Sequence, residues 1–149
     1  MVEYYLRQLD ETASNKVEAL FVHVFEQAPW HDDWSDKTQL KCYIHDLMGQ
    51  NNSLTFGLYE GKELVGLSMG RVKHWYTGTE YCIDELCICT EKQSQGLGAL
   101  FIREIEQACK AQGFTHLFLL TENDVPAYEF YKKQGFYELE TNVAFAKKL

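Results

Sequence analysis

The hydrophobic pattern of the first third of the chain predicts one strand followed by two helices. Residues 2–9 (VEYYLRQL) have the composition of a strand. Apolar residues then recur at the spacing of one helical face, and the helix ends at Pro29: Val17, Leu20, Phe21, Val24 and Phe25. A second helix is expected to open at Ser35 or Asp36 and to close at Gly49.

The central part of the chain has the shorter period of strands. Three segments alternate or are continuously apolar and are separated by glycine-containing turns: 53–61, 63–76 and 80–89. Consecutive strands joined by such short turns pair antiparallel. The centre of the chain is therefore predicted to be a three-stranded meander.

The last third returns to helical spacing and then alternates between strand and helix. A helix ending at Gly113 is followed by a strand at 116–121, a short helix at 125–134 and a last strand at 136–148. Because a helix joins the strands at 80–89 and 116–121, these two should be parallel, with a right-handed crossover. The prediction is one domain over residues 1–149 in the α/β class (an α+β mixed sheet), with the order βααβββαβαβ.

Composition narrows the function classes. The 149 residues are 46% hydrophobic and 24% charged, and the formal net charge is −8. This acidity argues against a nucleic-acid partner, which would need a basic surface, and it suits a cationic substrate. With no apolar stretch long enough for a membrane helix or a signal peptide, we expect a cytoplasmic protein without a membrane partner.

The cysteines and histidines give no metal motif. Five cysteines occur without a CxxC pair, and the histidines are scattered along the chain. Cys87 and Cys89 are expected to be reduced thiols that share one strand face. No metal is therefore expected.

A glycine-containing loop is the first candidate for a binding site. Gln93-Ser94-Gln95-Gly96-Leu97-Gly98 lies after a predicted strand and at the start of a helix. Its glycines allow close approach of a ligand, and the helix start offers free N–H groups and a positive dipole. Phosphate is the ligand that such a site favours, although a plain turn would have the same composition. The pattern is neither a nucleotide-triphosphate loop nor a full dinucleotide motif.

A second stretch makes that loop more informative. Residues 126–136 read PAYEFYKKQGF, a short helix closed by a glycine. A Q-x-x-G-x-G loop followed about thirty residues later by this stretch resembles the Gcn5-related N-acetyltransferase (GNAT) superfamily. The segments APWHDDWSD and ENDVPAYEFYKKQGF are also similar to the aminoglycoside 6′-N-acetyltransferase branch of that superfamily.

The resemblance implies a cofactor site. In such proteins the strand before the loop splays from its parallel neighbour, and acetyl-CoA enters the gap as the co-substrate. The main chain of Leu86, Cys87 and Ile88 would then hold the pantetheine arm. The pyrophosphate and the rest of the cofactor would be held by Gln93, Ser94, Gln95, Gly96, Leu97, Gly98, Ala99, Asn123 and Tyr128. Asn123 lies one residue farther from Ala127 than the family pattern has it.

Acetyl transfer to an amine requires proton transfer, because a free alkylamine is protonated at neutral pH. Glu85 is the first candidate for a general base and Asp84 the second; strict alternation would send them to opposite faces of the strand. Alternatively, both carboxylates are solvated or paired. By resemblance, Tyr131 is the general acid that protonates the departing thiolate, with packing as its alternative role. A backbone N–H near Cys87 or Ile88 would stabilise the oxyanion.

The loop after the first helix is the candidate substrate site. Trp30, Asp32, Asp33 and Trp34 combine carboxylates with aromatic rings, which suits an ammonium group. A solvated acidic loop anchored by a tryptophan would have the same sequence.

These observations predict an N-acetyltransferase that moves an acetyl group from acetyl-CoA to a primary amine of a small cationic molecule, such as an aminoglycoside or polyamine. Acetylation of a protein lysine or N-terminus is the second enzymatic interpretation. A non-catalytic sensor of acyl-CoA and a nucleotide-binding regulator are alternatives of another class. The apolar and aromatic content also permits a homodimer.

Overall fold

The structure is a computed structural model, and it describes residues 2–149. The helices and strands of this range follow in the order β1 (Tyr4–Leu9), α1 (Ser14–Phe25), α2 (Lys37–Met48), β2 (Ser53–Glu60), β3 (Glu63–Trp75), β4 (Gly78–Ile88), α3 (Leu97–Ala111), β5 (His116–Leu119) and α4 (Pro126–Lys133). Two single 3-10 turns precede α1 and follow β4, at Glu11–Ala13 and Thr90–Lys92. The α/β order predicted from the sequence is confirmed through α4.

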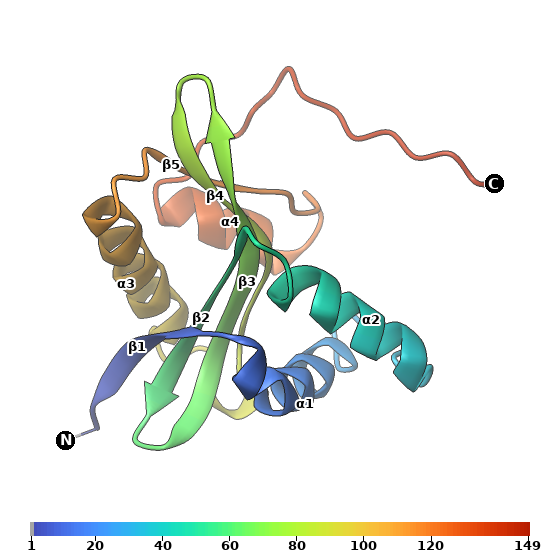
Figure 1. The fold of residues 1–149 in the computed structure, drawn as a ribbon. Helices are drawn as coiled ribbons and strands as arrows, with labels where there is room; N and C mark the ends of the chain where they lie inside the picture. The colour runs from blue at the N-terminus through green and yellow to red at the C-terminus, as the bar shows by residue number, and fades with distance from the viewer. Residues whose placement is uncertain (1) are drawn as a thin grey trace.

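One five-stranded sheet has the strand order β1-β2-β3-β4-β5 (Figure 1). The first three pairs are antiparallel, and β4 and β5 are parallel, as the helix between them requires. Pairing of β4 with β5 is short, because it covers only Glu80–Ile83 opposite His116–Leu119. From Asp84 onward β4 continues without β5, so the expected splay of the two parallel strands is confirmed.

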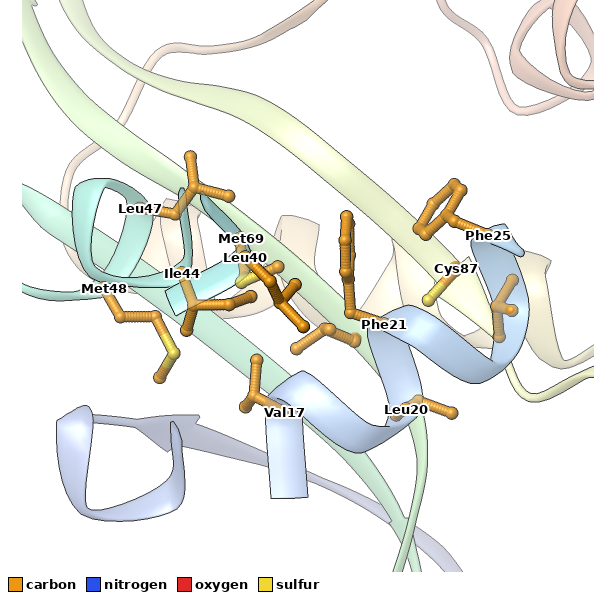
Figure 2. Packing of buried hydrophobic residues seen from close by; sticks show 12 residues of the cluster. Val17, Leu20, Phe21, Phe25, Leu40, Ile44, Leu47, Met48, Met69 and Cys87 are labelled. Atoms are coloured by element: carbon orange, nitrogen blue, oxygen red, sulfur yellow. The ribbon is translucent and has the colours of Figure 1, made fainter. Parts of the chain in front are cut away.

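Helices cover both faces of the sheet. Buried side chains of α1 and α2 pack on Leu67, Met69 and Cys87 from β3 and β4 (Figure 2). On the opposite face, α3 packs on β2 and β4 through Leu97, Phe101 and other apolar residues. The Asp36 carboxylate caps α2 by accepting a hydrogen bond from the Gln39 N–H at 3.0 Å, which supports Asp36 over Ser35 as the start signal.

A β-bulge interrupts β4 at Asp84. Met69 pairs with Glu85 and the next residue, Gly70, pairs with Ile83, so Asp84 has no partner in β3. The bulge shifts the alternation of the strand by one residue. Tyr81 and Ile83 before it and Leu86 and Ile88 after it therefore join the same apolar cluster under α3. The strict alternation expected from the sequence holds only on either side of the bulge.

The strand predicted at 136–148 is wrong. This segment follows α4 in an extended or turned conformation without pairing to any strand in the described chain. Gly135 turns the chain with a φ of 91°, and the Asn142 N–H donates to the Leu139 carbonyl in a further turn. The segment has the alternation of a strand but no neighbouring backbone to pair with. The strand expected at 116–121 is also shorter than predicted, because β5 ends at Leu119.

A buried hydrogen bond ties β3 to β4. The hydroxyls of Ser68 and Tyr81 lie 2.8 Å apart, and both residues are fully buried. We expect Tyr81→Phe to lower the free energy of unfolding by about 1–3 kcal/mol, because it leaves the buried Ser68 hydroxyl without its hydrogen-bond partner. Chemical denaturation measures the change. The double variant Ser68→Ala/Tyr81→Phe, which leaves neither partner behind, should recover part of the loss; an additive loss would contradict this account.

Candidate active site

The open edge of β4 presents main-chain groups to the space beyond β5. The Cys89 N–H donates to the Val65 carbonyl at 2.7 Å, so the main chain at this position faces β3. Alternation then turns the N–H and C=O of Ile88 and Leu86 toward the open edge, whereas those of Cys87 face Leu67. The Gln93 side chain confirms the direction for Ile88, because its Nε2 donates to the Ile88 carbonyl at 3.0 Å.

The loop between β4 and α3 has the geometry of an anion site. Ser94 and Gly96 have positive φ angles of 62° and 81°, and Gly96 precedes the first residue of α3. No side chain caps this helix start. Within residues 2–149, none of the N–H groups of Ser94–Ala99 donates a hydrogen bond to the protein. A helix of fifteen residues thus points its free N–H groups and its dipole toward the splayed strands.

Helix α4 is docked against this loop. A Cβ at Gly98 would lie 3.0 Å from the Phe130 ring, so the glycine lets α4 approach the start of α3 closely. The Tyr131 ring packs edge-on against Phe130 and Phe136, with 5.4 Å between ring centroids in both pairs. Tyr131 therefore stands on a helix held beside the open edge of β4.

Tyr131 is half-buried, and its hydroxyl has no hydrogen-bond partner in the described part of the chain. Burial raises the pKa of this hydroxyl, and electrostatic interaction with Cys87 and Glu85 raises it further. These two β4 residues are therefore its electrostatic neighbours. The side chain stays protonated at neutral pH and is free to donate.

Glu85 lies in an environment that disfavours its charge. Burial raises the pKa of this carboxyl to about 7, and the negative charges of Asp32 and Asp84 add to the effect. A hydrogen bond opposes them, because the Tyr43 hydroxyl donates to Glu85 Oε1 at 2.6 Å. The carboxyl therefore exchanges its proton near neutral pH, which is the property expected of a general base.

The acidic loop is connected to Glu85 through aromatic side chains. The Trp34 ring stacks on Tyr43 at a centroid distance of 5.3 Å and an interplanar angle of 14°, and Tyr43 in turn donates to Glu85. Trp34 Nε1 donates to Asp32 Oδ2 at 3.2 Å. Trp34 is thus a packing anchor that also holds one carboxylate of the loop near the candidate base.

Asp84, the second candidate base, is committed to an ion pair. Both of its carboxylate oxygens lie 2.9 Å from Arg71 Nη1. The pair lines a pocket of about 270 Å³ between α2, β3 and β4, which also includes Tyr43 and Asp46. The bulge thus places Asp84 at the pocket beside Glu85 and pairs it with arginine.

The remaining predicted residues lie farther from this arrangement or make other contacts. Asp33 accepts a hydrogen bond from the Ser35 N–H at 3.0 Å, and hydrogen bonding by the Ser35 side chain and backbone holds the pKa of its carboxyl below the usual value. The Trp30 ring packs on Phe25. Tyr128 donates to Glu138 at 2.8 Å, away from the loop. Asn123 and Gln95 are exposed, and Gln95 reaches only the Glu91 carbonyl, at 3.4 Å.

Sequence reasoning missed Tyr43 and Arg71. Tyr43 lies on a helix whose buried stripe does not include it, and Arg71 lies in the long strand β3. Neither belongs to a local motif. Their contacts to Glu85 and Asp84 depend on how α2 and β3 pack on β4, so no signal in the sequence could have identified them.

A side-chain cluster at the end of α1 bears on the expectation of no metal. His23, Cys89 and Glu91 offer ligand atoms within 4.8 Å of one another. They already satisfy each other, because His23 Nε2 and Cys89 Sγ each lie 2.8 Å from a Glu91 oxygen. These bonds lower the pKa of Glu91 to about 2, with the cysteine contact as the larger cause. The cluster is accounted for by hydrogen bonds, and the expectation of no metal stays a prediction.

Comparison with known proteins decides the family. A model described as "Acetyltransferase (GNAT) family" matches residues 16–136. The chain belongs to the GNAT family. This membership makes it an acetyl-CoA-dependent N-acetyltransferase and agrees with the splayed strands and the uncapped helix start described above.

Solved structures with this GNAT fold include aminoglycoside-modifying enzymes. An aminoglycoside acetyltransferase from an uncultured soil metagenomic sample, in complex with sisomicin, has 25% identity and a TM-score of 0.74 over 98% of this chain and 96% of that chain. The aminoglycoside N-acetyltransferase AAC(6')-Iy, in complex with CoA, has 12% identity and a TM-score of 0.75 over 100% and 97%. No curated protein matches the chain significantly.

A third structure shows how broadly the fold is used. A protein named as a transcriptional regulator from Bacillus halodurans C-125 has 14% identity and a TM-score of 0.76, over 97% of this chain and 100% of that chain. Likeness at this level shows the fold alone, so the acceptor must be argued from the site.

Among residues 2–149 of the GNAT protein, no helix is both long and apolar enough to span a membrane.

We expect Tyr43→Phe to raise the pKa of Glu85 above about 7, because the lost hydrogen bond stabilises the ionised carboxylate. Carboxyl-carbon NMR titration of Glu85 measures the shift directly. The matched control is Tyr5→Phe, whose hydroxyl bonds the Gly61 carbonyl and has no contact with Glu85. An unchanged or lower pKa in Tyr43→Phe would remove Tyr43 from this role.

Proposed function

We propose that this GNAT protein transfers the acetyl group of acetyl-CoA to a primary amine of a small cationic substrate of the aminoglycoside or polyamine class. The observation that carries the proposal is the position of Glu85. Its carboxyl has a pKa of about 7 and lies between the acidic loop and the open edge of β4. A base at the meeting point of an anion site and a cation site suits transfer from acetyl-CoA to a charged amine.

Acetyl-CoA is expected to lie along the open edge of β4. The main chain of Leu86 and Ile88 would pair with the pantetheine arm, in place of the hydrogen bonds that β5 does not make. The pyrophosphate would be held by the free N–H groups of the loop Ser94–Ala99. Gln93 would then exchange its bond to Ile88 for one to the co-substrate.

Cation recognition is assigned to the acidic side of the site. Asp32 is held by Trp34, and Asp46 lines the pocket next to Tyr43, in which Asp84 is already paired with Arg71. Carboxylates beside aromatic faces favour an ammonium group over a neutral ligand. A substrate with several amines could leave one cationic group there while another reaches Glu85.

The reaction follows from these positions. The neutral amine nitrogen attacks the thioester carbon, and Glu85 takes the proton that the nitrogen releases. The oxyanion is stabilised by a backbone N–H on the open edge, for which the strand direction favours Ile88 over Cys87. As the C–S bond breaks, the Tyr131 hydroxyl donates its proton to the CoA sulfur, leaving the amide and free CoA.

Two other functions are distinguished by experiment. Acetylation of a protein lysine or N-terminus would use the same chemistry with a polypeptide acceptor. A non-catalytic acyl-CoA sensor would bind acetyl-CoA without releasing thiol. The ordered Glu85–Tyr43 pair favours catalysis, because a sensor needs no base.

The deciding experiment measures CoA-thiol release from acetyl-CoA with a panel of aminoglycosides, polyamines and lysine peptides. Release with the small cationic amines supports the proposal, and release with peptides alone supports the second function. Binding of acetyl-CoA without release with any acceptor would favour the sensor.

We propose a cytoplasmic protein that acts without nucleic acid or membrane partners.

We expect Glu85→Gln to lower kcat/KM by about 10²–10⁴-fold near neutral pH, because the base is lost. The wild-type rate should rise with pH through an apparent pKa of about 7, and this limb should be absent from the variant. Glu80→Gln, on the same strand, is the matched control. An identical pH profile in Glu85→Gln and wild type would exclude Glu85 as the base.

Stability gives an independent measurement on Glu85. Its pKa in the folded protein is above the ordinary value of 4.5, so the folded state binds more protons between pH 4.5 and about 7. The free energy of unfolding should therefore fall as pH rises through this window. Glu85→Gln should remove that part of the fall, and urea denaturation at pH 5 and pH 8 tests it.

We expect Tyr131→Phe to lower kcat by at least about tenfold, because general acid catalysis typically contributes 10²–10⁴-fold. Acetyl-CoA affinity should remain nearly unchanged, because the ring still packs on Phe130 and Phe136. Single-turnover kinetics and calorimetric titration separate the two effects. Tyr137→Phe, on an exposed tyrosine nearby, serves as control. Unchanged turnover would leave Tyr131 a packing role only.

A further inference from the structure

Three side chains of the kinds that bind transition metals meet outside the residues assigned to acetyl transfer. His23 comes from the last turn of α1, whereas Cys89 and Glu91 come from the 3-10 turn after β4 and the residue before it. Their ligand atoms lie within 4.8 Å of one another. The expectation of no metal rested on spacing along the chain, which does not show that folding brings His23 to the other two.

Hydrogen bonds through one carboxylate hold these side chains together. Glu91 Oε1 lies 2.8 Å from His23 Nε2, and Glu91 Oε2 lies 2.8 Å from Cys89 Sγ. A thiol is a weak hydrogen-bond donor, so the second contact contributes little to stability. A deprotonated thiol is, in contrast, a strong zinc ligand. The strongest potential metal ligand of the cluster is therefore its most weakly satisfied member.

The turn that carries two of the three side chains is fixed by main-chain hydrogen bonds. The Cys89 N–H donates to the Val65 carbonyl at 2.7 Å, and the Lys92 N–H donates to the Cys89 carbonyl at 2.8 Å. The side chains of His23 and Glu91 are 43% and 62% exposed, so they can adjust to metal–ligand distances of about 2.0–2.3 Å. A cation would thus meet a fixed turn and adaptable side chains.

This set of ligands suits zinc in chemistry and in charge. Imidazole, thiolate and carboxylate are the three ligand types of zinc sites, whereas Mg²⁺ and Ca²⁺ prefer oxygen ligands alone. One thiolate and one carboxylate carry two negative charges, which balance those of Zn²⁺. The cluster lines a pocket of about 540 Å³, which gives water access to a fourth position. Lys16 and Lys62 also line this pocket and oppose a cation, while Glu63 favours one.

We propose that His23, Cys89 and Glu91 bind one Zn²⁺ ion, with water as the fourth ligand. On binding, the Cys89 thiol releases its proton to solvent, and the imidazole proton resides on Nδ1 so that Nε2 coordinates the metal. Bonds to the metal replace both hydrogen bonds to Glu91. Because the 3-10 turn leads into the loop Ser94–Ala99, the ion joins the end of α1 to the start of the candidate anion site. Its role is structural, and it takes no part in acetyl transfer.

Titration of the reduced, metal-free protein with Co²⁺ is the first test, because a cobalt–thiolate bond has a charge-transfer absorption. This absorption should saturate at one equivalent and disappear when Zn²⁺ displaces the cobalt. Cys89→Ser should abolish it, and Cys42→Ser, at an exposed cysteine on α2, is the matched control that should retain it. No absorption in the wild type, or an unchanged absorption in Cys89→Ser, would overturn the proposal.

Competition with a chromophoric chelator measures the affinity for Zn²⁺ itself. His23→Gln and Glu91→Gln should each raise the Kd by at least about tenfold, because even the loss of an outer-shell partner costs roughly 10–100-fold. His45→Gln should not change it, because His45 and Glu11 form an exposed pair at 3.4 Å that is not part of the cluster.

Thermal unfolding gives a readout that a loosely bound ion would not change. Zn²⁺ should raise the Tm of the wild type and leave that of Cys89→Ser unchanged, because only the folded protein brings the ligands together. Circular dichroism of the metal-free variants checks that each keeps its fold. An unchanged Kd in both His23→Gln and Glu91→Gln would mean adventitious binding to a thiol only and would overturn the site.

Discussion

The separation of β4 from β5 is the constraint on which the rest of the site depends. The two strands are held together over four residue pairs, and over its last five residues β4 is paired with β3 only. A parallel neighbour along this stretch would occupy the main-chain groups of Leu86 and Ile88. The Ile88 carbonyl already accepts a hydrogen bond from Gln93, and leaving the other groups open is costly unless a ligand or water completes their bonds. The sheet therefore has an open edge at the end of β4, where the co-substrate is expected to bind.

The groups proposed to bind the two substrates reach this stretch from opposite sides of the sheet. The loop at Ser94–Ala99 and helix α4 approach from the side of α3, held together by the close contact of Gly98 with Phe130. The acidic loop, Tyr43 and the Arg71–Asp84 pair approach from the side of α1 and α2. The bulge lets Asp84 and Glu85, which are adjacent in β4, both reach that second side. One irregularity in one strand therefore places two adjacent carboxylates on the side of the sheet proposed for the acceptor.

Local patterns in the sequence were sufficient for much of the fold. The helical stripe of Val17–Phe25 and the glycine turn before α3 each reflect a local preference, and the structure confirms both. The bulge at Asp84 and the contacts of Tyr43 and Arg71 could not be predicted, because they depend on packing between distant segments. The failure at residues 136–148 is of another kind. Alternation predicts which residues would share a strand face, but it does not predict whether a partner strand is available.

Glu85 and Asp32 are linked in a way that affects the order of events. The charge of Asp32 contributes to keeping the Glu85 carboxyl protonated. An ammonium group placed against Asp32 would offset that charge and favour ionisation of Glu85. Binding of the cation at Asp32 and release of the proton from Glu85 are then thermodynamically coupled, so each promotes the other. An empty acceptor site would hold a larger fraction of Glu85 in the neutral form, and an amine bound at Asp32 would increase the ionised fraction.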